Sequence, residues 1–291
     1  MAVGKKITDL TASGSLKDTD LAIVHDGNGT KKSTLTQLSE YLGTKFSNPN
    51  LLINPDFKIN QRGETTYEIG SKSYTVDRWA VEKGKVTVNS DGTVTATGGT
   101  TNEEGYYKQQ LENAISGDYT VSMEVISISG AVRIAIEGAW QNIKSGLNVF
   151  HGITGTGAVG LQLANGSSIT LKWVKLEQGS IATPFVAPNP AEELAKCRRF
   201  YELINMDTRH ATLIGNKVYV TVDVVPKRIT PTCKHLGNFK AIISNSMELP
   251  LTFNSATAIG GSVLQSFDVS SSTQGDGFCK DFKCTMDAEI Y

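Results

Sequence analysis

Residues 119–125 read Tyr-Thr-Val-Ser-Met-Glu-Val, with an aromatic or apolar side chain at every odd position and a polar one between. Successive side chains of a β-strand point to opposite faces, so this alternation predicts a strand with one buried and one solvated face. The same alternation recurs at residues 132–136 and again at residues 218–224. The sequence therefore predicts a mostly β protein.

Turn residues separate the alternating runs of the first 188 residues. Asp91-Gly92 and Asn165-Gly166 each lie between two such runs, and both pairs tolerate the positive φ of a tight hairpin turn. No helical pattern interrupts residues 50–186. We therefore expect a hairpin at each of these turns and a jelly-roll-like β-sandwich over residues 49–188.

Residues 1–48 are predicted to form a small unit of their own. A strand at residues 20–24 and a turn lead to a helix, which Thr34 and Gln37 would open as a capping box and Gly43 would end. One hairpin and one short helix cannot bury a core by themselves. This N-terminal segment therefore requires a partner chain or a docking surface.

Residues 189–291 are predicted to begin with a helix and to continue as a second β-domain. Asn189 is a favourable N-cap, and Pro190 suits the first helical position. Apolar residues at helical spacing extend the expected helix face as far as Ile204. The predicted architecture is an N-terminal hairpin plus helix, a central sandwich, a linker helix and a C-terminal β-sandwich.

The composition excludes several classes of protein. The 291 residues carry 28 basic and 29 acidic side chains, and the net charge of −1 gives no basic footprint for nucleic acid. No apolar run approaches the ~18 residues of a membrane-spanning helix, and the first residues show no secretion signal. We therefore expect neither nucleic-acid binding nor membrane insertion, and we expect the four cysteines to remain free thiols.

Motifs that resemble catalytic or cofactor sites lack the context that their chemistry needs. Residues 155–160 match G-x-G-x-x-G but lead into a predicted strand, so a glycine bulge is expected there and a dinucleotide site is not. Cys279 and Cys284 are an odd number of residues apart and would face opposite sides of one strand, which opposes a zinc site with Cys233 and His235. We expect no enzyme activity, no cofactor and no metal.

Aromatic residues beside amides, on predicted loops, form the candidate ligand site. Sugars present apolar C–H faces and hydroxyl edges, which aromatic rings and amide groups complement. The alternative is that Trp140 and Tyr107 simply cover the edge of the sandwich. The candidate residues for glycan binding are Tyr106, Tyr107, Trp140, Gln141, Asn142 and His151.

Three stretches, in order, resemble bacteriophage tail fibres and receptor-binding proteins. They are residues 6–38, residues 50–79, which begin Asn-Leu-Leu-Ile-Asn-Pro-Asp-Phe, and residues 174–201, which end Cys-Arg-Arg-Phe-Tyr. The resemblance implies a homotrimeric virion protein, made in the bacterial cytoplasm, with a carbohydrate-binding-like jelly roll. It also implies that residues 1–48 join other tail or baseplate proteins and that the β-domains bind host surface glycans.

The same resemblance fits two other functions. The chain could be a purely structural tail adaptor, collar or baseplate component that binds only other virion proteins. A hydrolase of surface polysaccharide is a third class, which would need clustered carboxylates in a cleft. The low net charge favours stacking and hydrogen bonds over charge steering in any host contact.

Overall fold

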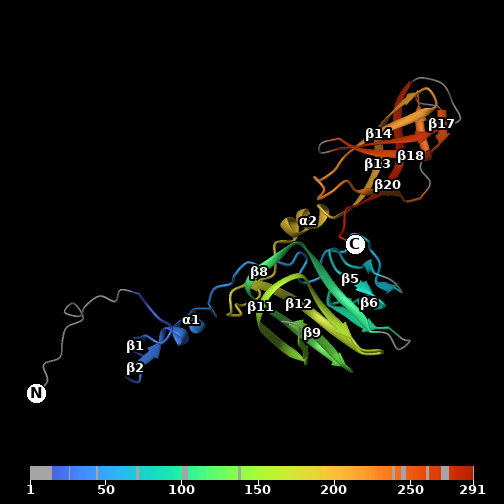
Figure 1. Cartoon of the computed structure of the whole chain (residues 1–291). Helices are drawn as coiled ribbons and strands as arrows, with labels where there is room; N and C mark the ends of the chain where they lie inside the picture. The colour runs from blue at the N-terminus through green and yellow to red at the C-terminus, as the bar shows by residue number, and fades with distance from the viewer. Residues whose placement is uncertain are drawn as a thin grey trace, which may run out of the picture. The chain divides into compact units, whose positions relative to one another are not determined.

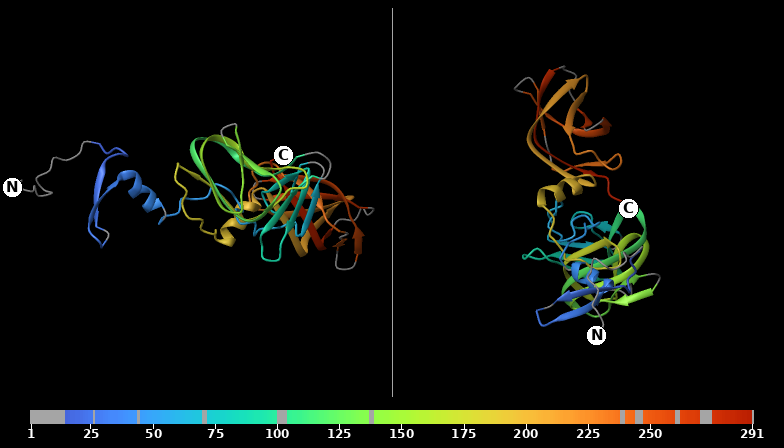
Figure 2. Two further views of the ribbon diagram at one scale, coloured as in Figure 1. Left: turned by 90° about the horizontal axis from the view of Figure 1, so that it is seen from below. Right: turned by 90° about the vertical axis from the view of Figure 1, so that its left-hand side faces the viewer.

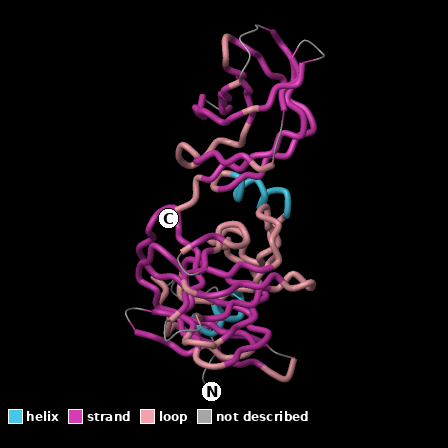
Figure 3. The backbone as a smooth tube through the Cα atoms, turned by 90° about the vertical axis from the view of Figure 1, so that its right-hand side faces the viewer, coloured by secondary structure: helices cyan, strands magenta, loops and turns pink. Residues whose placement is uncertain are grey.

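The computed structural model describes residues 15–25, 27–43, 45–69, 72–99, 104–136, 139–237, 240–243, 247–259, 262–269 and 275–290 (Figure 1). It is 58% strand and 7% helix, which confirms the mostly β class. Figure 3 shows strands along most of the described backbone. The chain divides into two compact units, Met1–Pro49 with Ile181–Val186, and Asn50–Ser180 with Ala187–Tyr291.

The first unit contains the predicted hairpin and helix. Its elements are β1 (Leu21–His25), β2 (Thr30–Thr34) and α1 (Leu35–Gly43). The capping box is confirmed, because the Gln37 N–H donates to Thr34 Oγ1 at 3.1 Å and the Thr34 N–H donates to Gln37 Oε1 at 3.0 Å. Gly43 is the last helical residue, and a Cβ there would lie 2.8 Å from Cγ2 of Ile181. The Ile181 side chain therefore leaves no room for a larger residue at position 43, which explains why glycine stands there.

The second unit begins with the central β-region, whose strands curl into two layers around one apolar core (Figure 2). Its path of paired strands runs β10-β9-β11-β8-β12-β7-β6-β3, with β4 on β5 and β5 on β8. The strands are β3 (Thr66–Ile69), β4 (Ser73–Tyr74), β5 (Ala80–Glu82), β6 (Gly84–Val88), β7 (Val94–Gly98), β8 (Gly105–Ser129), β9 (Val132–Ile136), β10 (Ala139–Asn142), β11 (Gly146–Leu163) and β12 (Ser168–Gln178).

The long strand β8 passes from one layer to the other. Its first end buries alternate side chains, and most side chains of residues 112–118 are exposed. Tyr119, Val121 and Met123 are buried, as the opening alternation predicts, but the predicted solvated face is wrong, because Thr120 and Ser122 between them are buried too. The register of β11 on β8 shifts around Gly155 and Ala158, so the glycine-rich stretch at residues 155–160 forms bulges within a strand.

One of the two predicted hairpins is wrong. Strands β6 and β7 pair around Asp91-Gly92 as expected. Strands β11 and β12 also flank a turn with a positive φ, at Gly166, but they do not pair with each other, because β8 lies between them in the sheet order. The turn carries the chain to the other layer. The turn itself was predictable from its residues, but the strands that pair with β11 and β12 were not.

The second unit continues with α2 and a second β-region around its own apolar core. Its path of paired strands is β17-β16-β20-β13-β14-β19-β18, with β15 on β20. The elements are α2 (Pro190–Arg198), β13 (Tyr201–Ile214), β14 (Lys217–Asp223), β15 (Thr232–His235), β16 (Lys240–Ile243), β17 (Met247–Pro250), β18 (Thr252–Ile259), β19 (Ser262–Asp268) and β20 (Gly275–Asp287). Neither α1 nor α2 is long and apolar enough to cross a membrane.

Helix α2 begins as predicted and ends earlier than predicted. The Asn189 side chain caps it by accepting from the Ala191 N–H at 2.9 Å, with Pro190 in the first turn. The predicted helix face through Ile204 is wrong, because β13 begins at Tyr201 and pairs with β20. This non-local strand pairing overrides the helical spacing of the apolar residues.

Strand β20 changes its alternation near Asp281. Lys280 and Asp281 are exposed in succession, and Asp281 has a φ of +53°. Cys279 and Cys284 are consequently both buried in the same core, so the prediction that they face opposite sides is wrong. A left-handed backbone at a non-glycine residue leaves little trace in the sequence pattern.

Candidate functional site

Four strands of the central region align polar side chains in one row. Asn142 of β10 pairs with Arg133 of β9, Arg133 pairs with Gln162 of β11, and Gln162 pairs with Tyr106 of β8. Residues directly opposite one another in antiparallel strands share a face of the sheet. We call these four residues the polar row, and they lie on the face opposite the buried apolar core.

Tyr107 lies on the core face of the same strand as Tyr106. Its ring stacks on Trp79, with centroids 5.2 Å apart, and the side chain is fully buried. Burial raises the pKa of its phenol far above the usual value. Tyr107 is therefore a core residue of β8 and not a loop platform, which removes it from the candidate surface.

Trp140 joins the polar row from the edge strand β10. It stands two residues before Asn142, so both side chains point to the same face, and 47% of Trp140 is exposed. The Arg133 guanidinium carbon lies 5.4 Å from the Trp140 ring centroid, within the range of a cation–π contact. Gln141, between them in sequence, pairs with Ile134 and points to the opposite side.

Glu104 connects the members of the polar row. Its Oε1 is 3.1 Å from Arg133 Nη2, and its Oε2 accepts a hydrogen bond from Gln162 Nε2. The same Gln162 amide donates to the Tyr106 hydroxyl at 3.1 Å. Arg133, Gln162 and Glu104 were missed in the sequence, because their contacts depend on a register between strands far apart along the chain.

Gln162 is the most deeply buried member of the polar row. It is 4% exposed, and its Oε1, which is inaccessible to solvent, has no hydrogen-bond partner among the described residues. Its Nε2 makes both of the hydrogen bonds described above. Gln162 therefore fixes the positions of its neighbours in the polar row and is not itself exposed to a ligand.

His151 is not part of this arrangement. It lies in the first half of β11, whereas Gln162 is the penultimate residue of that strand. Its Nδ1 is 3.2 Å from the Thr120 hydroxyl, which in turn donates to the Gly179 carbonyl at 2.7 Å. The structure thus brings Tyr106, Trp140 and Asn142 to one face and leaves His151 elsewhere.

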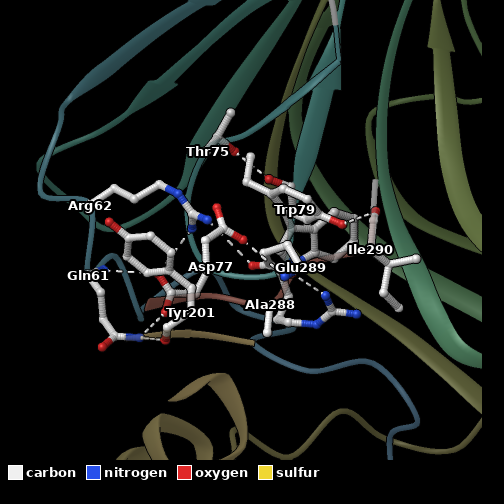
Figure 4. A network of polar contacts seen from close by, with 12 residues as sticks. Gln61, Arg62, Thr75, Asp77, Trp79, Tyr201, Ala288, Glu289 and Ile290 are labelled. Carbon is white, nitrogen blue, oxygen red and sulfur yellow. Dashed lines mark hydrogen bonds and ion pairs between the residues drawn. The ribbon is translucent and has the colours of Figure 1, made fainter. Parts of the chain in front are cut away.

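A second polar cluster is buried where the end of the described chain meets the central region (Figure 4). Arg78 forms an ion pair with Glu289, and Arg62 lies 3.7 Å from Asp77 and 3.6 Å from Glu289. The Gln61 N–H donates to Asp77 Oδ1 at 2.9 Å. Burial raises the pKa of both carboxyls above the usual range, despite the arginines beside them.

This cluster is structural in character. The side chains of Arg78, Asp77 and Glu289 are almost completely inaccessible to solvent. Arg78 also donates to the Gln110 carbonyl at 2.6 Å, and Trp79 donates from its indole to the Asn54 carbonyl at 2.8 Å. The cluster ties the last described residues to the central core, and its side chains are closed to solvent except for a small part of Arg62.

The structure brings together only some of the side chains that were considered as zinc ligands from the sequence. Cys233 Sγ lies 3.6 Å from His235 Nε2, and His235 is paired with Cys284, whereas Cys279 is paired with Ala241 of another strand. Within the described residues, no three His, Cys, Asp or Glu side chains are grouped so that they could hold a metal ion. All four cysteines are free thiols.

No protein-family model matches this chain, and no curated protein matches its sequence.

Proposed function

We propose that this chain is a bacteriophage tail fibre or receptor-binding protein that attaches to host surface glycans without catalysis. The observation that carries the proposal is the polar row with the exposed Trp140 beside it. The order of the three tail-protein-like stretches in the sequence supports the virion setting. Residues 1–48 would then join other tail or baseplate proteins.

The chemistry of the polar row suits a sugar. The Trp140 ring is an apolar platform for the C–H face of a pyranose, and the amides and guanidinium beside it match the hydroxyl edge. A shallow site of this kind binds weakly by itself. Three copies on one homotrimer would raise the apparent affinity by about 10²–10⁴ through avidity, provided that all three reach the same surface.

The N-terminal unit supports an oligomeric assembly. In its described part, no large apolar side chain is buried, and Leu21, Ile23, Tyr41 and Phe46 are well exposed. Exposed apolar patches of this kind mark interaction surfaces in soluble proteins. We propose that copies of this chain, and other tail proteins, cover these side chains in the virion.

The same exposed N-terminal side chains favour a second candidate function. A structural adaptor, collar or baseplate component would use them to bind virion proteins and would bind no host glycan. A surface-polysaccharide hydrolase would require a pair of carboxylates across a cleft, and Glu104 is already held by Arg133 and Gln162. We therefore propose no catalytic step.

Binding of the purified chain to an array of bacterial surface polysaccharides tests the proposal. Wild-type protein is expected to bind at least one glycan, and Trp140→Ala is expected to lose that binding. Leu147→Ala is the matched control, because Leu147 is a comparably exposed apolar residue of the same sheet, outside the polar row. Binding to tail proteins together with a blank array would favour the structural adaptor.

A further inference from the structure

We infer that the polar row, with Trp140 and Glu104, is a strip that binds an uncharged chain of several sugar rings. The inference rests on the proposed glycan-binding function and goes further by naming the class of glycan. It also assigns a ligand contact to Arg133 and a positioning role to Gln162. The reasons are the charge balance of the strip, its length across the sheet and the hydrogen bonds by which Gln162 holds Glu104 and Tyr106.

The charge balance favours a neutral ligand. Arg133 is the cation of the polar row, and Glu104 neutralises it at 3.1 Å. The carboxylate of an acidic sugar bound to Arg133 would stand beside the Glu104 carboxylate. Like charges in contact on a partly desolvated surface oppose binding. Hydroxyl groups meet no such opposition, because Arg133 and Asn142 both retain N–H groups that can donate to them.

The length of the strip favours several linked rings. The polar row crosses from β10 to β8, which is three strand spacings, or about 14 Å at roughly 4.8 Å each. Trp140 stands at the β10 end and Tyr106 at the β8 end. A single sugar ring covers only part of this distance. Successive rings could stack on Trp140 and hydrogen-bond to Arg133 and Tyr106.

Gln162 positions the polar groups of the strip. Its buried side chain donates from Nε2 to Glu104 and to the Tyr106 hydroxyl. Gln162 therefore holds this carboxylate and this hydroxyl in line along the strip, where sugar hydroxyls can bond to them. Replacing Gln162 with Met would release both groups and should weaken binding.

Calorimetric titration of the full chain with two sets of probes tests the inference. The neutral set comprises maltohexaose, hexa-N-acetylchitohexaose, mannohexaose and galactan oligosaccharides, and the acidic set comprises polygalacturonate, alginate and polysialic acid oligosaccharides. Wild type is expected to bind a neutral probe, to bind longer chains of it more tightly and to show little dependence on salt. Trp140→Ala and Gln162→Met are expected to weaken binding at least about tenfold, whereas Leu147→Ala is not.

The outcomes separate this inference from the proposed function. Two results would contradict the inferred strip but would still agree with the proposed glycan-binding function. One is salt-dependent binding of acidic probes only. The other is binding of a neutral probe that Trp140→Ala and Gln162→Met both retain. If the chain binds neither the neutral nor the acidic probes and adheres to no bacterial cell, both the proposed function and the inferred strip are wrong. Denaturant unfolding of each variant shows whether a loss of binding reflects a loss of fold.

Discussion

Arg78 and Glu289 are 211 residues apart in the chain and form an ion pair in which both side chains are buried from solvent. Arg78 has a φ of +72°, a conformation that costs a non-glycine residue free energy. Such strain persists only where the surroundings hold the residue in place. Here the holding groups are Glu289 and the Gln110 carbonyl, so the end of the described chain helps to fix the central region.

Glu289→Gln should strongly destabilise the chain. The substitution removes the negative partner of Arg78 and leaves a buried guanidinium without its counter-charge, which typically costs about 3–5 kcal/mol. Urea unfolding, followed by tryptophan fluorescence, measures the loss. Glu68→Gln is the control, because its ion pair with Lys85 is exposed and is worth about 0–1 kcal/mol. Equal effects of the two substitutions would show that the buried pair has no special role.

Acid should destabilise the second β-region through His235. Its ring is packed against Phe253, Phe267 and Phe282, and burial lowers its pKa to about 4 from the usual 6.5. The unfolded chain takes up a proton near pH 6.5, whereas the folded chain does so only near pH 4. This contribution to stability is therefore fully present above pH 6.5 and is lost as the pH falls toward 4.

The size of this effect is on the order of 2 kcal/mol, after allowance for the partial exposure of the ring. His235→Phe keeps the aromatic packing and cannot be protonated, so its unfolding midpoint should fall less than that of wild type between pH 7 and pH 4.5. His210→Phe is the control, since the His210 side chain is exposed. If His235→Phe keeps the full pH dependence, another group is responsible.

Ile23→Asp should dissociate the proposed trimer. Ile23 is 77% exposed in β1, and burial of its side chain between copies is the reason proposed for assembly. A charge in that contact would be desolvated without a partner, which opposes association. Light scattering coupled to size-exclusion chromatography should give a trimer for wild type and a monomer for Ile23→Asp. Glu40→Lys, a charge change on the exposed side of α1, should leave the trimer intact.

A monomeric wild-type chain in that measurement would contradict the trimer. A trimer that survives Ile23→Asp would place the contact between copies elsewhere. Either result would leave the glycan strip untouched, because the strip is assembled from residues of one chain.

Local features of the sequence predicted the elements of the fold well. The capping box of Thr34 and the cap at Asn189 each depend on neighbours within a few positions, and both are confirmed. The alternation at residues 119–125 predicted the strand, but it did not predict that Thr120 and Ser122 are buried as well. The failures involve partners that are distant in sequence. Gly166 turns the chain between layers, and pairing with β20 converts the expected helix at Tyr201 into strand.

The candidate site was only partly predictable for the same reason. Trp140 and Asn142 were found because an aromatic residue stood beside amides in one short stretch. Arg133 and Gln162 were missed, because only the pairing of β10, β9, β11 and β8 aligns them. Tyr107 was included because a sequence does not say which face of β8 carries the core.

Glycan binding by the Trp140 face is the central claim, and one array experiment tests it most directly. Wild type and Trp140→Ala, shown to unfold at the same urea concentration, are applied to the same panel of bacterial polysaccharides and neutral oligosaccharides. The account predicts that wild type binds at least one neutral glycan and that Trp140→Ala loses this binding. A blank array for the wild type, or equal binding by the two proteins, would contradict it.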